Sequence, residues 1–248
     1  MTSDSSTEQL GPSRAGLLVV VAVRAEADAV LRGLRDGARP VPVPGAELWR
    51  GEHDCGVPVD VLVGGVGPAA VAAATANVLA RHRYELVVSA GIAGGFVPHA
   101  PIGSVVVAEE IVAADLGAET PTGFEDVARL GFGTVRHTPS PAAVALAAEA
   151  LGATAGTVLT VSTVTGSAER AAELAARHPG AAAEAMEGFG VAEAAALNGL
   201  PVFEIRAVSN AVGPRDRSAW RIGEALGALE RAFRTLPYPE LLQEVTHG

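Results

Sequence analysis

Short runs of mainly apolar residues recur along this chain, and the segments between them have the length and composition of helices. A strand that is covered on both faces is apolar throughout, whereas a half-exposed strand alternates apolar and polar residues. The pattern therefore predicts an α/β fold, with helices on both faces of a mainly parallel or mixed sheet. We interpret as strands the runs 17–23, 59–63, 85–89, 103–108, 157–161 and 202–208. Helices are predicted over 25–35, 68–82, 140–151, 167–178, 187–198 and 218–235.

The 248 residues, 49% of them apolar, suffice for a sizeable core. Because no linker divides the chain, we expect a single domain over 16–248, preceded by a polar, disordered tail over 1–15. The Gly- and Pro-rich segments 36–46 and 96–103 are predicted to be turns or loops. The stretch 115–137 is long for a plain connection and has little periodicity, so it is a candidate functional loop.

Charge and composition argue against several classes of function. The net charge is −10, there is no lysine, and no basic stripe is present, so a nucleic-acid partner is not expected. A single cysteine, Cys55, excludes an intramolecular disulfide framework. The first residues lack the basic start and apolar run of a signal peptide, and no apolar run has the length of a membrane span. We therefore expect a cytoplasmic protein without membrane contacts.

In open α/β sheets, ligands bind beyond the carboxyl ends of the strands. Three glycines follow one predicted strand within 90–95. They favour a close approach between the backbone and a ligand at Gly91 and Ile92, although packing alone could require one or two of them. The turn at 64–67 has neither the lysine of a Walker motif nor the third glycine of a dinucleotide fingerprint. By itself, the pattern therefore fits a tight turn as well as it fits an anion-binding turn.

Two carboxylates and one guanidinium lie where chemistry is expected. Glu26 begins a helix after a strand, so it is either a partner of the helix dipole or a base that activates water. Glu187 follows Met186 at the start of a helix, and it either serves the dipole or accepts two hydrogen bonds from a ribose diol. Arg206 lies in an apolar strand, where its charge requires a partner or a wet cleft. Asn210, at the strand end, is a turn residue or a contact for a base.

Together these segments resemble the nucleoside phosphorylase/nucleosidase superfamily, and within it the hydrolytic branch that contains methylthioadenosine/S-adenosylhomocysteine nucleosidase. The similarity covers about 17–235 and is most specific in MEG at 186–188 and RAVSN at 206–210. It implies a three-layer α/β/α sandwich around a twisted mixed central sheet, assembled as a homodimer or higher homo-oligomer. The six histidines have no metal-ligand spacing, and we expect neither a metal ion nor another cofactor.

The resemblance also implies a role for each candidate. Glu26 matches the glutamate that activates water in this superfamily. Met186 and Glu187 match its ribose-binding pair, and Arg206 matches the arginine near the nucleophilic water.

Two positions depart from the adenine-specific enzymes of that branch. Asn210 stands where they carry an aspartate, and Ile92 where they usually carry Ser or Thr. A 6-oxopurine presents an acceptor at O6, which a carboxylate would oppose and an amide N–H would satisfy. Asn210 therefore indicates hypoxanthine or guanine as the leaving base. We expect Ser209 to support Asn210 and Val164 to contact the face of the base.

With Glu26 and Asn210, the tracts ADLGAETPTGF and SNAVGPRDRSAW are most similar to the futalosine hydrolase family. This implies hydrolysis of futalosine to hypoxanthine and dehypoxanthine futalosine on the route to menaquinone. From the residues alone we infer only that a small-molecule 6-oxopurine nucleoside is cleaved by water.

Three alternatives remain: a purine nucleoside phosphorylase, a methylthioadenosine/S-adenosylhomocysteine-type nucleosidase, and a non-catalytic nucleoside-binding protein. Phosphorolysis requires paired cations for a dianion, and Arg24 is the one candidate beside the glycine-rich turns. A binding protein would not require both Glu26 and Glu187.

Overall fold

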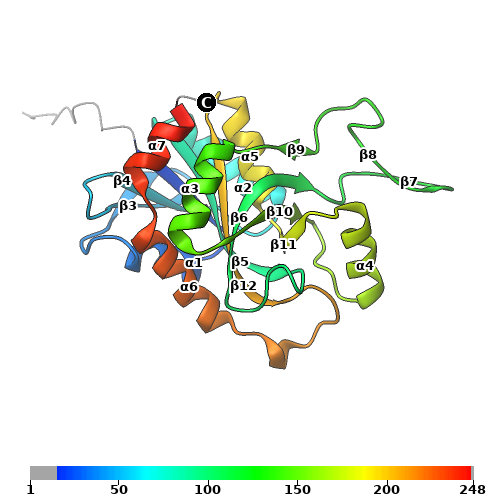
Figure 1. Ribbon diagram of the computed structural model, residues 1–248. Coiled ribbons are helices and arrows are strands. Elements are labelled where there is room, and N and C mark those ends of the chain that lie inside the picture. The colour runs from blue at the N-terminus through cyan, green and yellow to red at the C-terminus, as the bar shows by residue number, and fades with distance from the viewer. Residues whose placement is uncertain (1–15, 247–248) are drawn as a thin grey trace, which may run out of the picture.

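The computed structural model describes residues 16–246 (Figure 1). Its strands are β1 (Leu17–Val21), β2 (Arg39–Val43), β3 (Ala46–Glu52), β4 (Pro58–Val63), β5 (Leu86–Gly95), β6 (Val105–Ala113), β7 (Gly117–Thr120), β8 (Gly123–Asp126), β9 (Arg136–His137), β10 (Thr154–Thr160), β11 (Ala181–Ala185) and β12 (Val202–Ala211). Its helices are α1 (Arg24–Arg32), α2 (Pro68–Leu79), α3 (Pro141–Leu151), α4 (Ala168–Arg177), α5 (Gly188–Leu197), α6 (Ile222–Thr235) and α7 (Tyr238–Thr246). The predicted tail over 1–15 lies outside the described residues.

The main sheet is mixed, as expected, and has the strand order β11-β10-β6-β12-β5-β1-β4-β3-β2. Strands β1, β4, β5 and β12 run parallel, whereas β12 is antiparallel to β6. Strand β11 pairs with β10 on one side and with the end of β5 on the other. Strands β11, β10, β6, β12 and β5 therefore close into a ring. Residues at the ends of these strands contribute to the candidate site.

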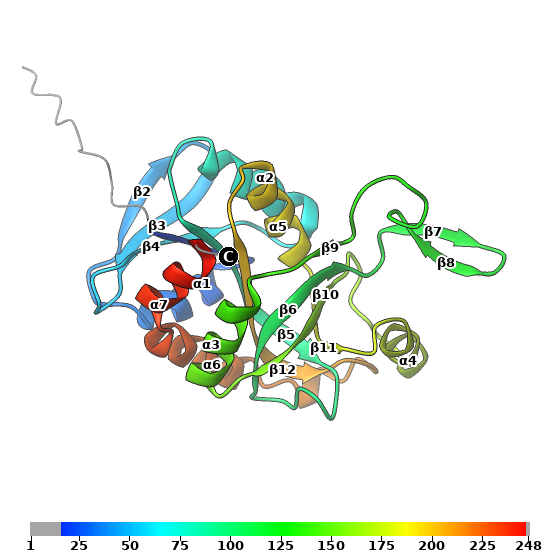
Figure 2. The same cartoon turned by 45° about the horizontal axis from the view of Figure 1, so that its top comes forward.

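Helices cover the two faces of the sheet, which confirms the α/β class (Figure 2). Along β1, Leu17, Val19 and Val21 pack with residues of α1, α3, α6 and α7. The alternate residues Leu18 and Val20 pack on the other face with residues of α2 and α5. Burial on both faces explains why this strand has no polar alternation.

Segment 36–46, predicted to be a turn or loop, is instead mostly strand. Strand β2 pairs antiparallel with β3, and its two prolines lie opposite Trp49 and Glu47. Proline lacks an N–H and is tolerated in a sheet at an edge, which is the place of β2 in the strand order. The prolines therefore mark an edge strand here and do not mark a break.

Two predicted strands extend further than their apolar runs. Strands β5 and β12 continue through 90–95 and 209–211 and pair with each other there, with a shift in register between Val208 and Asn210. The loop predicted over 115–137 contains the hairpin β7–β8, which projects from the body of the protein in Figures 1 and 2. Across residues 16–246, no helix combines the length and the apolar composition needed to cross a membrane.

Candidate active site

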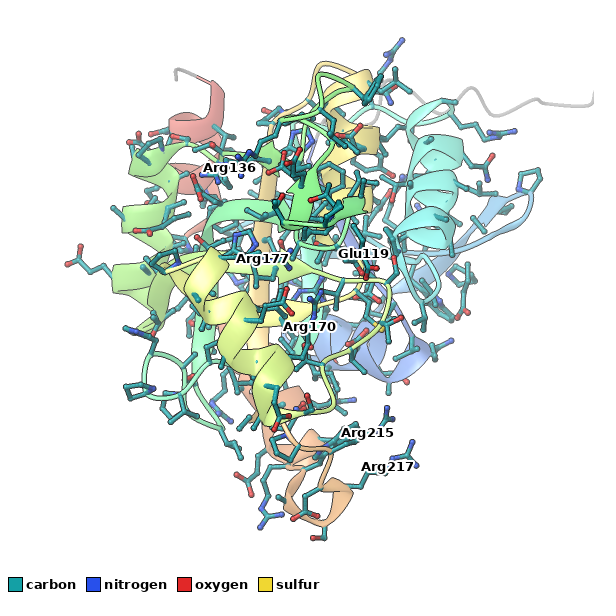
Figure 3. The ribbon with its side chains drawn as sticks, turned by 90° about the vertical axis from the view of Figure 1, so that its right-hand side faces the viewer. Glu119, Arg136, Arg170, Arg177, Arg215 and Arg217 are labelled. Atoms are coloured by element: carbon teal, nitrogen blue, oxygen red, sulfur yellow. The ribbon has the colours of Figure 1, made fainter. Side chains whose placement is uncertain are left out.

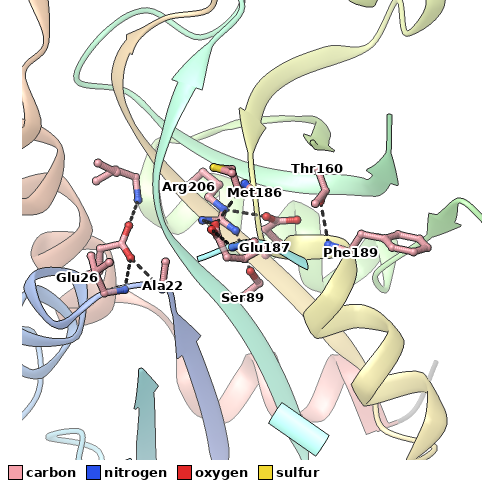
Figure 4. A network of polar contacts seen from close by, with 12 residues as sticks. Ala22, Glu26, Ser89, Thr160, Met186, Glu187, Phe189 and Arg206 are labelled. Carbon is pink, nitrogen blue, oxygen red and sulfur yellow. Dashed lines mark hydrogen bonds and ion pairs between the residues drawn. The ribbon is translucent and has the colours of Figure 1, made fainter. Parts of the chain in front are cut away.

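Glu26 lies in the first turn of α1, directly after β1, and is only 4% exposed. Its Oε2 accepts hydrogen bonds from the backbone N–H groups of Ala22 (3.0 Å) and Val23 (3.2 Å). Its Oε1 accepts one from the N–H of Ile92 (2.9 Å). Figure 4 shows Glu26 beside Ala22 with its hydrogen bonds as dashed lines. Burial raises the pKa of the Glu26 carboxyl, an effect that the Ile92 N–H and the charge of Arg206 partly oppose. A carboxylate that is aimed in this way and titrates above its usual range suits a general base.

Arg206 is fully buried in β12 and is surrounded by polar partners. Its Nε donates to Glu204 Oε1 (2.8 Å), Nη2 donates to Ser89 Oγ (3.0 Å), and Nη1 lies 3.4 Å from Glu187 Oε2. Burial raises the pKa of Glu204, and the ion pair with Arg206 opposes this increase. The sequence analysis missed Glu204, although two residues spaced by two along a strand share a face.

Glu187 is the N-cap residue of α5, at the predicted position. Its Oε1 accepts a hydrogen bond from Gly67 N–H (3.2 Å), and its Oε2 accepts one from Met186 N–H (3.3 Å). The glycine-rich turn at 64–67 therefore presents an N–H to a carboxylate of the protein itself. The side chain of Met186 is partly exposed beside this carboxylate.

Gly91 is the point at which the two charged groups converge. A Cβ at this position would lie 2.6 Å from Glu26 Oε1 and 2.9 Å from Arg206 Nη1. Only glycine therefore leaves space for both side chains. The absence of a side chain at this position accommodates the charged residues of the protein as well as any ligand. We call Glu26, Glu187, Glu204 and Arg206 the charge network.

A pocket with about 440 Å³ of empty space, part of it open to solvent, lies further along the same strands. Gly94, Val164, Glu184, Asn210 and Trp220 are among its lining residues. We call it the base pocket, because it contains the two residues that were expected to contact a base.

Asn210 enters the base pocket from the end of β12. The Ser209 hydroxyl lies 2.8 Å from Asn210 Oδ1 and 3.2 Å from the carbonyl oxygen of Ala93, so it can donate to either. Asn210 Nδ2 donates to the carbonyl of Ala211 (3.0 Å), which leaves its second hydrogen for a ligand acceptor. Val164 is 37% exposed, as a side chain that contacts a ligand must be.

The base pocket also contains residues that the sequence analysis did not single out. Glu184 comes from β11, and Arg215 and Trp220 come from the segment after β12. The guanidinium carbons of Arg215 and Arg217 lie 5.5 Å and 5.9 Å from the centre of the Trp220 ring. Both arginines project from this segment in Figure 3. No residue of 115–137 is among those that line this pocket.

The structure thus brings Glu26, Gly91, Ile92, Met186, Glu187 and Arg206 together at one centre, and Val164 and Asn210, with Ser209 behind it, at the other. Strand β5 runs past both centres. Among residues 16–246, no group of three or more His, Cys, Asp or Glu side chains is arranged to hold a metal ion.

Residues 17–236 match the family model of the phosphorylase superfamily, so the chain belongs to this superfamily. It is 60% identical over 228 residues to futalosine hydrolase of Streptomyces coelicolor, covering 89% of this chain and 94% of that protein. It is 49% identical over 224 residues to futalosine hydrolase of Acidothermus cellulolyticus, covering 88% and 89%. The chain therefore belongs to the futalosine hydrolase family.

The fold is also similar to the solved structure of a nucleosidase. The methylthioadenosine/S-adenosylhomocysteine nucleosidase of Colwellia psychrerythraea, crystallised with adenine, superposes with a TM-score of 0.72 at 25% identity. The match covers 95% of this chain and 98% of that one.

Proposed function

We propose that this protein hydrolyses the N-glycosidic bond of futalosine and releases hypoxanthine and dehypoxanthine futalosine, as a step of menaquinone biosynthesis. Membership of the futalosine hydrolase family supports the substrate. The observation that carries the hydrolytic chemistry is the Glu26 carboxyl of the charge network, which is buried and held by three backbone N–H groups.

In this mechanism, Glu26 removes a proton from a water molecule as the water oxygen bonds to C1′ of the ribose. Glu187 accepts hydrogen bonds from the ribose hydroxyls, with Met186 against the sugar. Arg206 contacts Glu187 and holds its carboxylate in place. Proton removal by a positioned base typically contributes about 10²–10⁴-fold to the rate. The backbone of Gly91 and Ile92 lies between the Glu26 carboxylate and the ribose.

The electrons of the broken C1′–N9 bond leave with the purine, which takes up a proton from solvent. Asn210 stabilises this leaving group because its N–H can donate to O6 and its carbonyl oxygen can accept from a protonated N7. Ser209 orients the amide, since its hydroxyl is within hydrogen-bonding distance of Oδ1. Val164 packs against the face of the base.

The charge distribution favours hydrolysis over phosphorolysis. Arg24, the cation expected to serve phosphate, is already paired with Asp28 (2.7 Å) and Glu47 (2.8 Å). Arg206 is shared by Glu204 and Glu187. A phosphate dianion would enter a centre whose carboxylates outnumber its guanidinium, which is electrostatically unfavourable.

The test is a substrate panel of futalosine, aminodeoxyfutalosine, inosine and methylthioadenosine, with release of the base followed with and without phosphate. We expect hypoxanthine from futalosine without phosphate. A strict requirement for phosphate would assign the protein as a phosphorylase, and preferential release of adenine would assign it as a methylthioadenosine-type nucleosidase. Binding without release would assign it as a nucleoside-binding protein.

We further propose that residues 16–248 fold as one domain, and that the protein is cytoplasmic and forms a homodimer or higher homo-oligomer. The similarity to the superfamily supports the assembly. Light scattering coupled to gel filtration at several concentrations tests it, and a mass equal to that of one 25.0 kDa chain would contradict it.

A further inference from the structure

Glu184 and Asn210 both line the base pocket, and they come from the two strands that pair with β5 at Gly94. Each of the two residues is the register partner of Gly94, Glu184 on β11 and Asn210 on β12. Residues paired across neighbouring strands project from the same face of the sheet. Glu184, Gly94 and Asn210 therefore form one row, with the two polar side chains on either side of a residue that has none.

The glycine in the middle of this row leaves a gap. A Cβ on Gly94 would lie 3.4 Å from Asn210 Nδ2 and 3.0 Å from the side chain of Val212. Neighbouring strands are about 4.8 Å apart, so the backbones at Glu184 and Asn210 are about 10 Å apart. Both side chains line the same pocket, on either side of the gap at Gly94.

The Glu184 carboxylate retains capacity for a ligand. The residue is 6% exposed and accepts two hydrogen bonds from Thr165, one from the backbone N–H at Oε1 (2.8 Å) and one from the hydroxyl at Oε2 (2.5 Å). A carboxylate offers about four acceptor positions, so about two remain. Burial raises the pKa of Glu184, and the two hydrogen bonds from Thr165 oppose this increase. Holding the 162–167 segment alone would not require a charged group.

A 6-oxopurine presents two adjacent groups of opposite character on its six-membered ring. O6 is an acceptor, and N1 carries a hydrogen and is a donor. In a 6-aminopurine both are reversed, because the amino group donates and N1 accepts. An amide N–H facing O6 and a carboxylate facing N1 therefore match the first pattern and oppose the second.

We propose that Glu184 determines base specificity by accepting a hydrogen bond from N1–H of the purine, while Asn210 contacts O6 and N7. The assignment rests on the proposed cleavage of a 6-oxopurine nucleoside and adds a second residue that reads the base. It also gives Gly94 a function, as the gap over which the ring spans the two strands.

The first test is calorimetric binding of free hypoxanthine and adenine to the wild-type protein and to Glu184→Gln, which keeps the shape of the side chain. Hydrogen bonds to charged groups are worth enough that we expect hypoxanthine to bind about 10- to 100-fold more weakly to the variant. Adenine binding should not weaken, because adenine has no N1–H to lose and the amide of Gln no longer opposes its N1 acceptor. Glu149→Gln, on the exposed side of α3, is the matched control and should leave both constants unchanged.

Equal weakening of both bases in Glu184→Gln would show that the residue only holds Thr165 and would overturn the proposal. So would a wild-type protein that does not prefer hypoxanthine to adenine. If the variant does not fold, 1-methylhypoxanthine tests the same contact in the wild-type protein, because it lacks the N1 hydrogen. It should bind at least about 10-fold more weakly than hypoxanthine, and equal binding would refute the contact.

These binding measurements do not depend on turnover. Absence of hypoxanthine release from futalosine by the wild-type protein would refute the proposed function, whereas base binding would still report on Glu184. Conversely, normal futalosine hydrolysis with unchanged base selectivity in Glu184→Gln would refute this inference and leave the proposed function intact.

Discussion

The charge network and the base pocket lie along the same strand, yet they are built in opposite ways. In the network, Arg206 is fully buried, Glu26 and Glu187 are 4% and 6% exposed, and backbone N–H groups hold both carboxylates. In the base pocket, the amide of Asn210 is partly exposed, and exposed residues after β12 form the rim. A rigid, preorganised centre suits bond cleavage, whereas an open pocket can change its selectivity through one or two side chains.

The difference predicts that substitutions in the network abolish turnover or stability, whereas those in the base pocket redirect the enzyme. The largest effect is expected for Glu26→Gln, which removes the base but keeps the shape and can still accept from Ile92 N–H. The rate of hypoxanthine release from futalosine should fall by about 10²–10⁴-fold, while calorimetric affinity for the substrate changes little. Near-normal turnover would remove Glu26 from the mechanism.

The next largest effect is on stability. Arg206→Leu leaves Glu204 buried without its cation, and breaking a buried ion pair in this way typically costs about 3–5 kcal/mol of the free energy of unfolding. The double variant Arg206→Leu/Glu204→Gln removes the orphaned charge and should recover part of this loss. Urea denaturation of the three proteins measures both quantities. If the double variant were no more stable than the single one, the network would not owe its stability to charge pairing.

These two predictions concern residues that could be identified from the sequence. An arginine inside an apolar strand and a glutamate at a strand-to-helix junction are local anomalies, so Arg206 and Glu26 could be identified from their neighbours along the chain. The apolar runs gave the central strands for the same reason, since burial on both faces removes alternation.

The base pocket could be predicted only in part. Asn210 and Val164 were found through resemblance, but Glu184 lies in β11, a strand of alanines and one glutamate whose composition does not indicate a strand. Its position opposite Asn210 depends on the pairing of β11 and β12 with Gly94, between segments far apart in the sequence. The edge hairpin β2–β3 was missed for a related reason: its prolines have meaning only once the edge of the sheet is known.

In the base pocket, Asn210→Asp should alter preference while turnover persists. A carboxylate opposes O6 of hypoxanthine and matches the 6-amino group of adenine, and a mispaired polar contact costs about 1–3 kcal/mol. We therefore expect kcat/KM for futalosine relative to aminodeoxyfutalosine to fall by about 5- to 150-fold. The two substrates are assayed side by side. An unchanged ratio would mean that Glu184, or another part of the pocket, decides the base alone.

The smallest expected effect is a displacement of the pH profile, and it concerns the network. Glu26 acts as a base only when ionised, and burial raises its pKa above the usual range of a glutamate. As pH falls through this raised pKa, kcat/KM should decline, and the decline should begin at a higher pH than for an exposed carboxyl of pKa about 4.3. Glu204→Gln is the informative control because Glu204 also has a raised pKa but forms its ion pair with Arg206. If the acidic limb stays in place in this variant, Glu26 sets it; if the limb moves to lower pH, the titrating group is Glu204. In that case protonation of Glu204, and not protonation of the general base Glu26, would limit kcat/KM at low pH.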